Sequence, residues 1–363
     1  MRILHATMLR YSIKGIMNQL DWEARAAKSE GIPFRTELFI SGTESSCEKQ
    51  KRNTYPQKKI SFINWLRERK SYLDFLIENQ NKYDLLLLRW LPHDPFFLRF
   101  LLNTKTPVIT AHHTLEGYEL GLASRFGSIR QATDDYFFKL ASRKIIGISG
   151  VTNEIVTYEL TRSVCKNIST FVYPNGIFWD KNLVICGKIG DSNIPGLVFV
   201  ASDFADWHGL DRLLQAVMGS NSKFLLRVVG PVPNNLPAGF KSDSRVHFTG
   251  SLDRESLMRI YEDSDIGLSS FALDRKGMKE ACTLKVREYL RYGLLVFSGH
   301  QDIFPIDFPF YNRGNPDMNE ILDFYNKFKG FAKEDVANAS RKFIDKRVLL
   351  KKLYTNLERR LKN

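Results

Sequence analysis

Glu280 and Glu288 lie eight residues apart in the stretch GMKEACTLKVREYLRYGLLVFSG. Directly after Glu280 comes a short polar segment, residues 281–283, which we call the step. The apolar residues after that step recur at helical spacing, at Leu284, Val286, Tyr289 and Leu290. This spacing predicts a helix that starts near Thr283, with Thr283 as its N-cap. The first amides of a helix have no partner within it and carry the positive end of its dipole. The step is therefore a predicted anion site, suited to phosphate.

The charged residues around this step narrow the choice of ligand. Lys285 falls in the first turn, where a cation opposes the helix dipole unless an anion is bound, and this indicates a diphosphate. Glu280 and Glu288 can accept hydrogen bonds from sugar hydroxyls on either side of it. A nucleotide-sugar needs this combination, although two solvated glutamates around an ordinary helix cap explain the spacing equally well.

Strand-length apolar runs alternate with helical patterns along the chain. The strands expected in the first half are residues 2–7, 34–42, 83–90, 107–113, 144–149 and 168–175, with helices at 15–30, 61–78 and 124–142. The second half restarts with strands at 196–202, 223–230, 246–250, 266–271 and 294–299, and with helices such as 209–218 and 254–263. This alternation predicts the α/β class, with parallel sheets covered by helices on both faces.

The chain is long enough for two domains, since its 363 residues exceed the usual size of one. The turn signal Pro174-Asn175-Gly176 places the boundary near Asn175. We expect domains at 1–174 and 175–345, and a basic helix at 346–363 that could cross back to the first. Two such domains would face a cleft and bind ligands at the carboxyl ends of their strands.

Composition and charge restrict the function classes. No run approaches the ~20 apolar residues of a membrane span. The cysteines lack metal-ligand spacing, so we expect free thiols in the cytosol, at Cys47, Cys165, Cys186 and Cys282. The formal charge of +13 attracts polyanions such as nucleic acid, an anionic membrane or a phosphorylated ligand. No zinc-finger or helix-turn-helix signature accompanies it, so no nucleic-acid partner is expected.

The stretch around Glu280 resembles the nucleotide-sugar site of GT-B glycosyltransferases, particularly of glycosyltransferase family 4. The signature of that family is a glutamate, seven residues and a second glutamate, which here correspond to Glu280 and Glu288. Leu295 replaces a usual proline, and Arg291 replaces a small residue. The resemblance covers nearly the whole chain, through the segments YPNGI, VFVASDFADWHGLDRLLQA, LLRVVGPVP and VHFTGSLDRESLMRIYEDSDIGLSSF.

The resemblance implies the GT-B fold, with two Rossmann-like α/β/α domains, the first for the acceptor and the second for the nucleotide-sugar. It assigns Glu280 to the transferred sugar as a catalytic residue, and Glu288 to the ribose. The backbone at Thr283 and Leu284, together with Lys285, would hold the diphosphate.

The loop after the first strand of the second domain departs from the family. Many members carry an arginine and a lysine there, and this chain has Ser202 and His208 at those positions. His208 can donate a hydrogen bond to phosphate, or it is an exposed residue at a helix start. Arg275 and Lys276 could supply the missing charge as a phosphate clamp. Gly230, after the strand LLRVV, is expected on the donor side.

In the first domain, the resemblance places His113 beside the sugar as a catalytic residue that positions and polarises rather than acting as an obligatory base. The alternative is a structural histidine at a strand end. Glu116 is expected to contact the acceptor, and Arg89, at another strand end, is expected either to contact the acceptor or to have a structural role. Gly15 stands in place of the family's glycine-rich turn, where the backbone would approach the donor.

A basic stretch lies between Lys49 and Lys70, with eight Lys or Arg residues. Apolar residues trace one face of the helix expected within and after it, at Phe62, Trp65, Leu66, Leu73 and Leu76. A basic amphipathic helix of this kind binds anionic membrane interfaces. An apolar stripe that faces the core, with a solvated opposite side, is the alternative.

Together with these features, the resemblance implies a metal-independent, retaining, hexosyltransferase-like glycosyltransferase without a cofactor. It would transfer a sugar from a UDP- or GDP-sugar to a glycan acceptor, in the synthesis of a cell-surface polysaccharide or lipid-linked oligosaccharide. We expect it in the cytoplasm, able to bind the inner face of the cell membrane. A nucleotide-sugar epimerase of the same fold is the alternative enzyme, and a basic nucleic-acid-binding protein is the non-enzymatic alternative.

Overall fold

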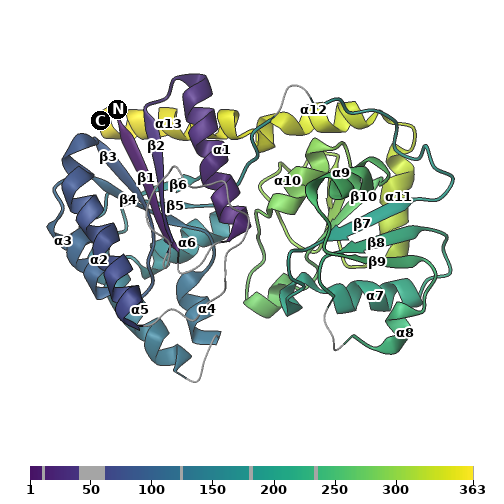
Figure 1. Cartoon of the computed structure of the whole chain (residues 1–363), viewed down its shortest axis with the longest axis horizontal. Coiled ribbons are helices and arrows are strands. Elements are labelled where there is room, and N and C mark those ends of the chain that lie inside the picture. Colours follow the sequence, from purple (N-terminus) through teal and green to yellow (C-terminus); the bar gives the residue numbers. More distant parts are fainter. Residues whose placement is uncertain (10–12, 41–61, 123–125, 180–182, 233–235, 363) are drawn as a thin grey trace. The chain divides into compact units, whose positions relative to one another are not determined.

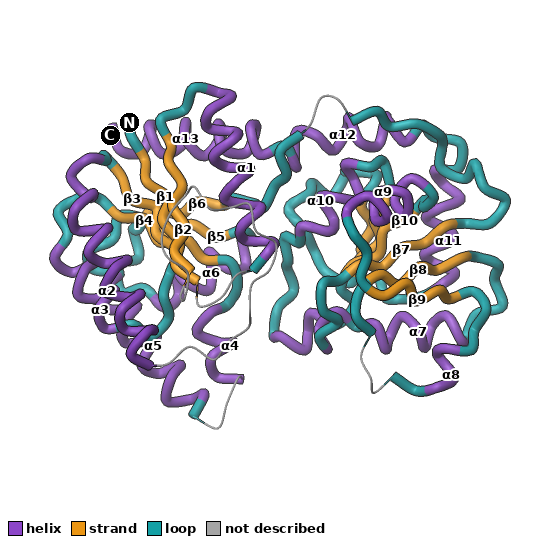
Figure 2. Tube along the Cα trace, viewed as in Figure 1, coloured by secondary structure: helices purple, strands orange, loops and turns teal. Residues whose placement is uncertain are grey.

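The computed structural model describes residues 1–9, 13–40, 62–122, 126–179, 183–232 and 236–362. The chain divides into two compact units, one made of Met1–Pro174 and Lys346–Asn363 and the other of Asn175–Asp345. Each unit is built around its own six-stranded sheet with helices packed on it (Figure 1, Figure 2).

The sheet of the first unit is parallel throughout, in the order β2-β1-β3-β4-β5-β6. Its strands are β1 (Ile3–Leu9), β2 (Phe34–Ile40), β3 (Leu85–Arg89), β4 (Val108–His112), β5 (Gly147–Gly150) and β6 (Ser169–Val172). Its helices are α1 (Lys14–Glu30), α2 (Phe62–Asn79), η1 (Gln80–Lys82), α3 (Pro95–Asn103), α4 (Glu116–Leu122), α5 (Gly127–Ala141), α6 (Asn153–Arg162) and α13 (Lys346–Lys362). The central strands are buried along almost their whole length, as parallel strands covered on both faces must be.

The C-terminal helix α13 belongs to the first unit, where it packs against α1 (Figure 1). At its start, the Lys346 ammonium lies 3.3 Å from the Glu23 carboxylate of α1, and Glu23 lies 2.6 Å from Nδ1 of His5 on β1. Further along, the Tyr354 hydroxyl lies 3.0 Å from the Met1 ammonium. A buried ionic cluster therefore joins α13 to α1 and β1, and a partly buried hydrogen bond joins Tyr354 to Met1.

The sheet of the second unit is also parallel, in the order β12-β11-β10-β7-β8-β9. Its strands are β7 (Gly196–Val200), β8 (Leu225–Val229), β9 (Val246–Gly250), β10 (Ile266–Ser269), β11 (Leu295–Ser298) and β12 (Tyr311–Arg313). Its helices are η2 (Asp206–His208), α7 (Leu210–Met218), α8 (Ala238–Lys241), α9 (Arg254–Glu262), η3 (Leu273–Lys276), α10 (Leu284–Arg291), α11 (Met318–Phe328) and α12 (Lys333–Ile344).

The predicted α/β class with two parallel sheets is confirmed. Every strand expected from the sequence is present, with ends that differ by a few residues. The sequence interpretation missed β12, because a three-residue edge strand is too short for its pattern to stand out. Cys165, Cys186 and Cys282 are free thiols, and Cys47 lies outside the described residues.

Candidate functional site

The start of α10 is the centre of the predicted donor site. Thr283 has the extended backbone of an N-cap residue, as predicted, but its hydroxyl does not cap the helix. Instead, that hydroxyl lies 3.5 Å from the hydroxyl of Ser269 at the end of β10. Within the described part of the chain, the amides of Leu284 and Lys285 have no hydrogen-bond acceptor. The positive end of the helix is therefore open to an anion.

Glu288 lies one turn into α10 and is already linked to two donors. Its Oε2 accepts from Lys285 Nζ at 2.7 Å and from the hydroxyl of the buried Tyr261 at 2.9 Å. The side chains of Lys285 and Glu288 remain partly exposed. Lys285 therefore has a carboxylate partner in its own helix, so its position in the first turn does not by itself indicate a diphosphate, contrary to the sequence interpretation.

Glu280 is positioned by backbone pairing. It forms a short parallel bridge with Gln301, closed by hydrogen bonds from Ala281 N to Gln301 O and from Gln301 N to Lys279 O, both 3.0 Å. Gln301 follows β11, so the segment that carries Glu280 is attached to the carboxyl end of the sheet. The Glu280 side chain is partly exposed.

A fully buried arginine holds the step before α10, and the sequence interpretation missed it. Arg287 donates to both oxygens of Asp302, at 2.5 and 2.6 Å, and to the carbonyls of Thr283 and Asn175 at 3.2 and 3.1 Å. Asn175 in turn donates to the Cys282 carbonyl at 2.7 Å. A bidentate pair of this kind restricts the relative orientation of the two side chains and also adds binding energy. The sequence signal was present, because Arg287 interrupts the apolar side of its helix.

The loop after β7 carries Ser202 and His208, at the positions where the family has basic residues. Ser202 is exposed. The His208 ring stacks on Trp207 with centroids 3.7 Å apart, and its Nδ1 lies 3.2 Å from the Ala205 carbonyl. Burial lowers the pKa of His208. At neutral pH this loop therefore offers an uncharged imidazole rather than a cation.

The two residues predicted as a phosphate clamp have partners within the second unit. Arg275 pairs with Asp211 at 2.7 Å and donates to the Asp206 carbonyl at 2.8 Å. The Lys276 ammonium lies 4.9 Å from the centre of the Trp207 ring. Arg275 thus joins η3 to the loop after β7 and to α7, and it would have to leave Asp211 to contact a phosphate. The clamp stays a prediction.

The two glycines predicted on the donor side differ in structure. Gly230 has a φ of 132°, and a Cβ there would lie 2.0 Å from the Ala201 carbonyl, so only glycine fits. Gly230 therefore lets the end of β8 pack closely against the end of β7. Gly15 lies in the first turn of α1. Contact of either glycine with a donor stays a prediction.

In the first unit, His113 directly follows β4. Its amide donates to Glu116 Oε1 at 3.0 Å, and Glu116 Oε2 lies 3.2 Å from Nδ1 of the buried His112. Burial, followed by the charges of Arg89 and His5, holds the pKa of His113 well below its ordinary value. His113 is therefore neutral at pH 7 and can donate or accept a hydrogen bond.

Glu116 and Arg89, the predicted acceptor contacts, lie at the start of α4 and at the end of β3. Both oxygens of Glu116 already have donors in the unit, so Glu116 also fixes the turn that carries His113. Arg89, at the end of β3, has a buried Nη1 without a hydrogen-bond partner among the described residues. Burial lowers the pKa of Arg89, while Glu116 and Glu119 oppose this shift. An anionic ligand would satisfy the open guanidinium position.

A buried ionic network lies behind the turn. His112, Glu116 and Glu159 have ligand atoms within 4.8 Å of one another, a spacing that a metal ion could use. However, Arg162 donates to both oxygens of Glu159 at 3.1 Å and to Asp134 at 2.5 Å, so a cation is already in place. Burial raises the pKa of Glu159 to about 7. The network is consistent with positioning of His112 rather than with a metal site.

Part of the predicted basic stretch lies outside the described residues, namely residues 49–61 and the side chains of Phe62 and Trp65. Of the expected apolar face, Leu76 is fully buried and the partly buried Leu73 packs against the core, so part of this face of α2 packs on the first unit. Leu66 is partly exposed.

No protein-family model matches the chain, and no curated protein sequence matches it. Solved structures match it over almost its full length. Sucrose-phosphate synthase from Thermosynechococcus elongatus has 14% identity and a TM-score of 0.67, with 99% of each chain covered. The lipopolysaccharide outer core galactosyltransferase WaaB has 10% identity and a TM-score of 0.64, over 99% of this chain and 100% of the other. HepE of Anabaena with UDP-glucose has 12% identity and a TM-score of 0.62, over 98% and 99%. The chain has the GT-B fold, as predicted.

Proposed function

We propose that this GT-B chain is a retaining glycosyltransferase, which moves a sugar from a nucleotide-diphosphate donor to a glycan acceptor. The observation that carries the proposal is the step before α10, where open helix amides lie between Glu280 and Glu288. The similar structures support it, since one is named as a galactosyltransferase and another was solved with UDP-glucose.

The residues divide the chemistry among them. In the reaction, the bond between the anomeric carbon and the diphosphate oxygen breaks, and its electrons go to the diphosphate. The α10 amides and Lys285 stabilise that developing charge, which is where electrostatic help counts most. The acceptor oxygen bonds to the same carbon from the same face and passes its proton to the departing phosphate. Glu280 binds the sugar hydroxyls, Glu288 binds the ribose, and the neutral His113 positions and polarises.

The proposed donor is a nucleotide-diphosphate-sugar, and HepE, a structure of similar fold, was solved with UDP-glucose. We take a UDP-sugar as the first donor to test and a GDP-sugar as the second. The acceptor is a growing cell-surface polysaccharide or a lipid-linked oligosaccharide, and Arg89 binds an anionic group on it. The enzyme works on the cytoplasmic side of the cell membrane, with the basic stretch Lys49–Lys70 against anionic lipid. Among the described residues, no helix is long and apolar enough to cross a membrane.

Donor binding and transfer test this proposal in sequence. Thermal-shift screening against UDP-, GDP- and ADP-sugars identifies the donor, since a ligand at about a hundred times its dissociation constant stabilises by ~2.7 kcal/mol. Glu280→Ala should then reduce transfer of labelled sugar by about a hundredfold or more, while Lys279→Ala, its exposed neighbour, should not. Undiminished transfer by Glu280→Ala from every donor would show that the assignment is wrong. Glycan growth, rather than epimerised donor, separates this activity from that of an epimerase.

A further inference from the structure

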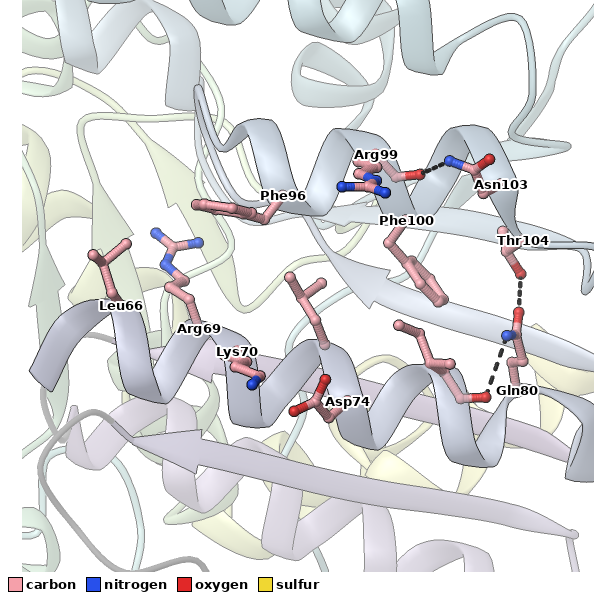
Figure 3. A pocket seen from close by; sticks show the side chains of 12 residues that line it. Leu66, Arg69, Lys70, Asp74, Gln80, Phe96, Arg99, Phe100, Asn103 and Thr104 are labelled. Carbon is pink, nitrogen blue, oxygen red and sulfur yellow. Dashed lines mark hydrogen bonds between the residues drawn. The ribbon is translucent and has the colours of Figure 1, made fainter. Parts of the chain in front are cut away.

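A groove of about 670 Å³ lies between α2 and α3 on the first unit (Figure 3). Both helices contribute apolar side chains to it, namely Leu66, Leu73, Ile77, Phe96 and Phe100. The groove is not part of the proposed donor site, which belongs to the second unit.

Three cations accompany these apolar walls. Arg69 and Lys70 come from α2, and Arg99 comes from α3 across the groove (Figure 3). Arg69 pairs with Asp94 at the start of α3. Lys70 and Arg99 are exposed and have no ion pair within the described part of the chain. One acid, Asp74, lies a turn after Lys70, so the groove keeps an excess of positive charge.

Large apolar side chains are also exposed on these two helices. Phe96 is 45% exposed, Ile77 is 54% exposed and Ile63, near the start of α2, is 69% exposed. An apolar surface that remains in water on two neighbouring helices marks an interaction site. Because cations without an ion pair among the described residues lie beside this apolar surface, the expected ligand has both an apolar part and a negative charge.

We propose that the α2–α3 groove binds one anionic phospholipid of a bilayer, with an acyl chain along its apolar walls and the phosphate between Lys70 and Arg99. Free phosphate would leave the apolar walls in water, and an apolar peptide would leave the two cations unmatched. A lipid satisfies both. This inference deepens the membrane part of the proposed function and does not depend on the donor.

Vesicle binding of the full chain tests the charge. Wild-type protein should sediment with phosphatidylcholine vesicles that contain phosphatidylglycerol, and not with phosphatidylcholine alone. Each basic residue at an anionic leaflet is worth about fivefold in affinity, so Lys70→Ala with Arg99→Ala should weaken binding about 30-fold. Arg143→Ala with Lys144→Ala removes the same charge from an exposed site after α5 and should change it less than about threefold. An equal loss in both pairs, or no wild-type binding, overturns the proposal.

A soluble short-chain lipid tests the groove itself. Dihexanoyl-phosphatidylglycerol, below its micelle concentration, should raise the melting temperature of the wild type, and glycerol phosphate should not. Ile77→Ser with Phe96→Ser replaces two exposed apolar walls and should abolish the response. An equal response to both compounds, or an unchanged response in this variant, means that the groove does not hold a lipid chain. Stabilisation by the nucleotide-sugar should persist in every variant, so failure here is distinguishable from failure of the proposed function.

Discussion

The turn after β4 and the step before α10 both carry predicted site residues at the end of a parallel sheet, but they handle charge differently. In the first unit His112 and Glu116 are themselves buried, and burial with neighbouring charges lowers the pKa of His113 well below its ordinary value. In the second unit Lys285 and Glu288 stay partly exposed, and the buried charge, Arg287, holds the backbone behind them. In the second unit, therefore, the residue that supports the backbone differs from the residues expected to contact a ligand, whereas in the first unit the same residues do both.

Removal of the buried arginine that supports the second unit should cost the most unfolding free energy. Arg287→Met leaves the Asp302 carboxylate buried and unpaired, so the unit should lose about 3–5 kcal/mol of unfolding free energy. Urea unfolding measures this loss. Arg212→Met, which breaks an exposed pair with Asp274, is the matched control and should cost at most about 1 kcal/mol. Equal losses in the two variants would show that Arg287 is no special support.

The second prediction concerns the buried charges of the first unit, through Glu23. Burial opposes ionisation there, but His5 and Lys346 lower the pKa of Glu23 to about 2. Because the folded pKa lies below the unfolded one, its stabilisation is present above about pH 4.5 and is lost as pH falls toward 2. Glu23→Gln should therefore cost about 3 kcal/mol at pH 7, and less at pH 3.

Urea unfolding of wild type and variant at both pH values measures this dependence. The exposed Glu255→Gln should show no such change with pH. If the cost of Glu23→Gln is the same at pH 7 and pH 3, the buried cluster does not act through its charge.

The interactions of Arg287 and Glu23 also show which features the sequence alone does not predict. Helical periodicity was enough to predict α10 and the N-cap position of Thr283, because both depend on neighbours along the chain. The pair of Glu23 with Lys346 joins residues 323 positions apart, and Arg287 reaches Asn175 across 112 positions. Only tertiary packing brings such groups together. The partner of Lys285 lies three residues away, yet it too was missed, because the sequence argument considered the helix dipole and not the neighbouring carboxylate.

The third prediction concerns the exposed charges of the second unit. Glu288→Gln keeps an acceptor for the Tyr261 hydroxyl but removes the charge that the ribose would use. A hydrogen bond to a charged group is worth about 1.5–3 kcal/mol, so donor affinity should fall by about ten- to a hundredfold. Calorimetric titration with the donor measures this fall, and stability should change by less than about 1 kcal/mol. Unchanged affinity would remove Glu288 from the site.

The smallest effect on stability is expected at Thr283, where the comparison is sharpest. A side chain that caps a helix contributes about 1 kcal/mol. Asp253 does so for α9, since it accepts from the Ser256 amide at 2.8 Å, and Asp253→Ala should lose that amount. The Thr283 hydroxyl makes no such bond, so Thr283→Ala should lose less than about 0.5 kcal/mol. If Thr283→Ala lowers donor affinity but not the free energy of unfolding, the open amides at the start of α10 serve to bind a ligand. If instead both alanine variants lose equal stability, Thr283 is an ordinary cap, and the separation of support from contact in the second unit does not extend to this residue.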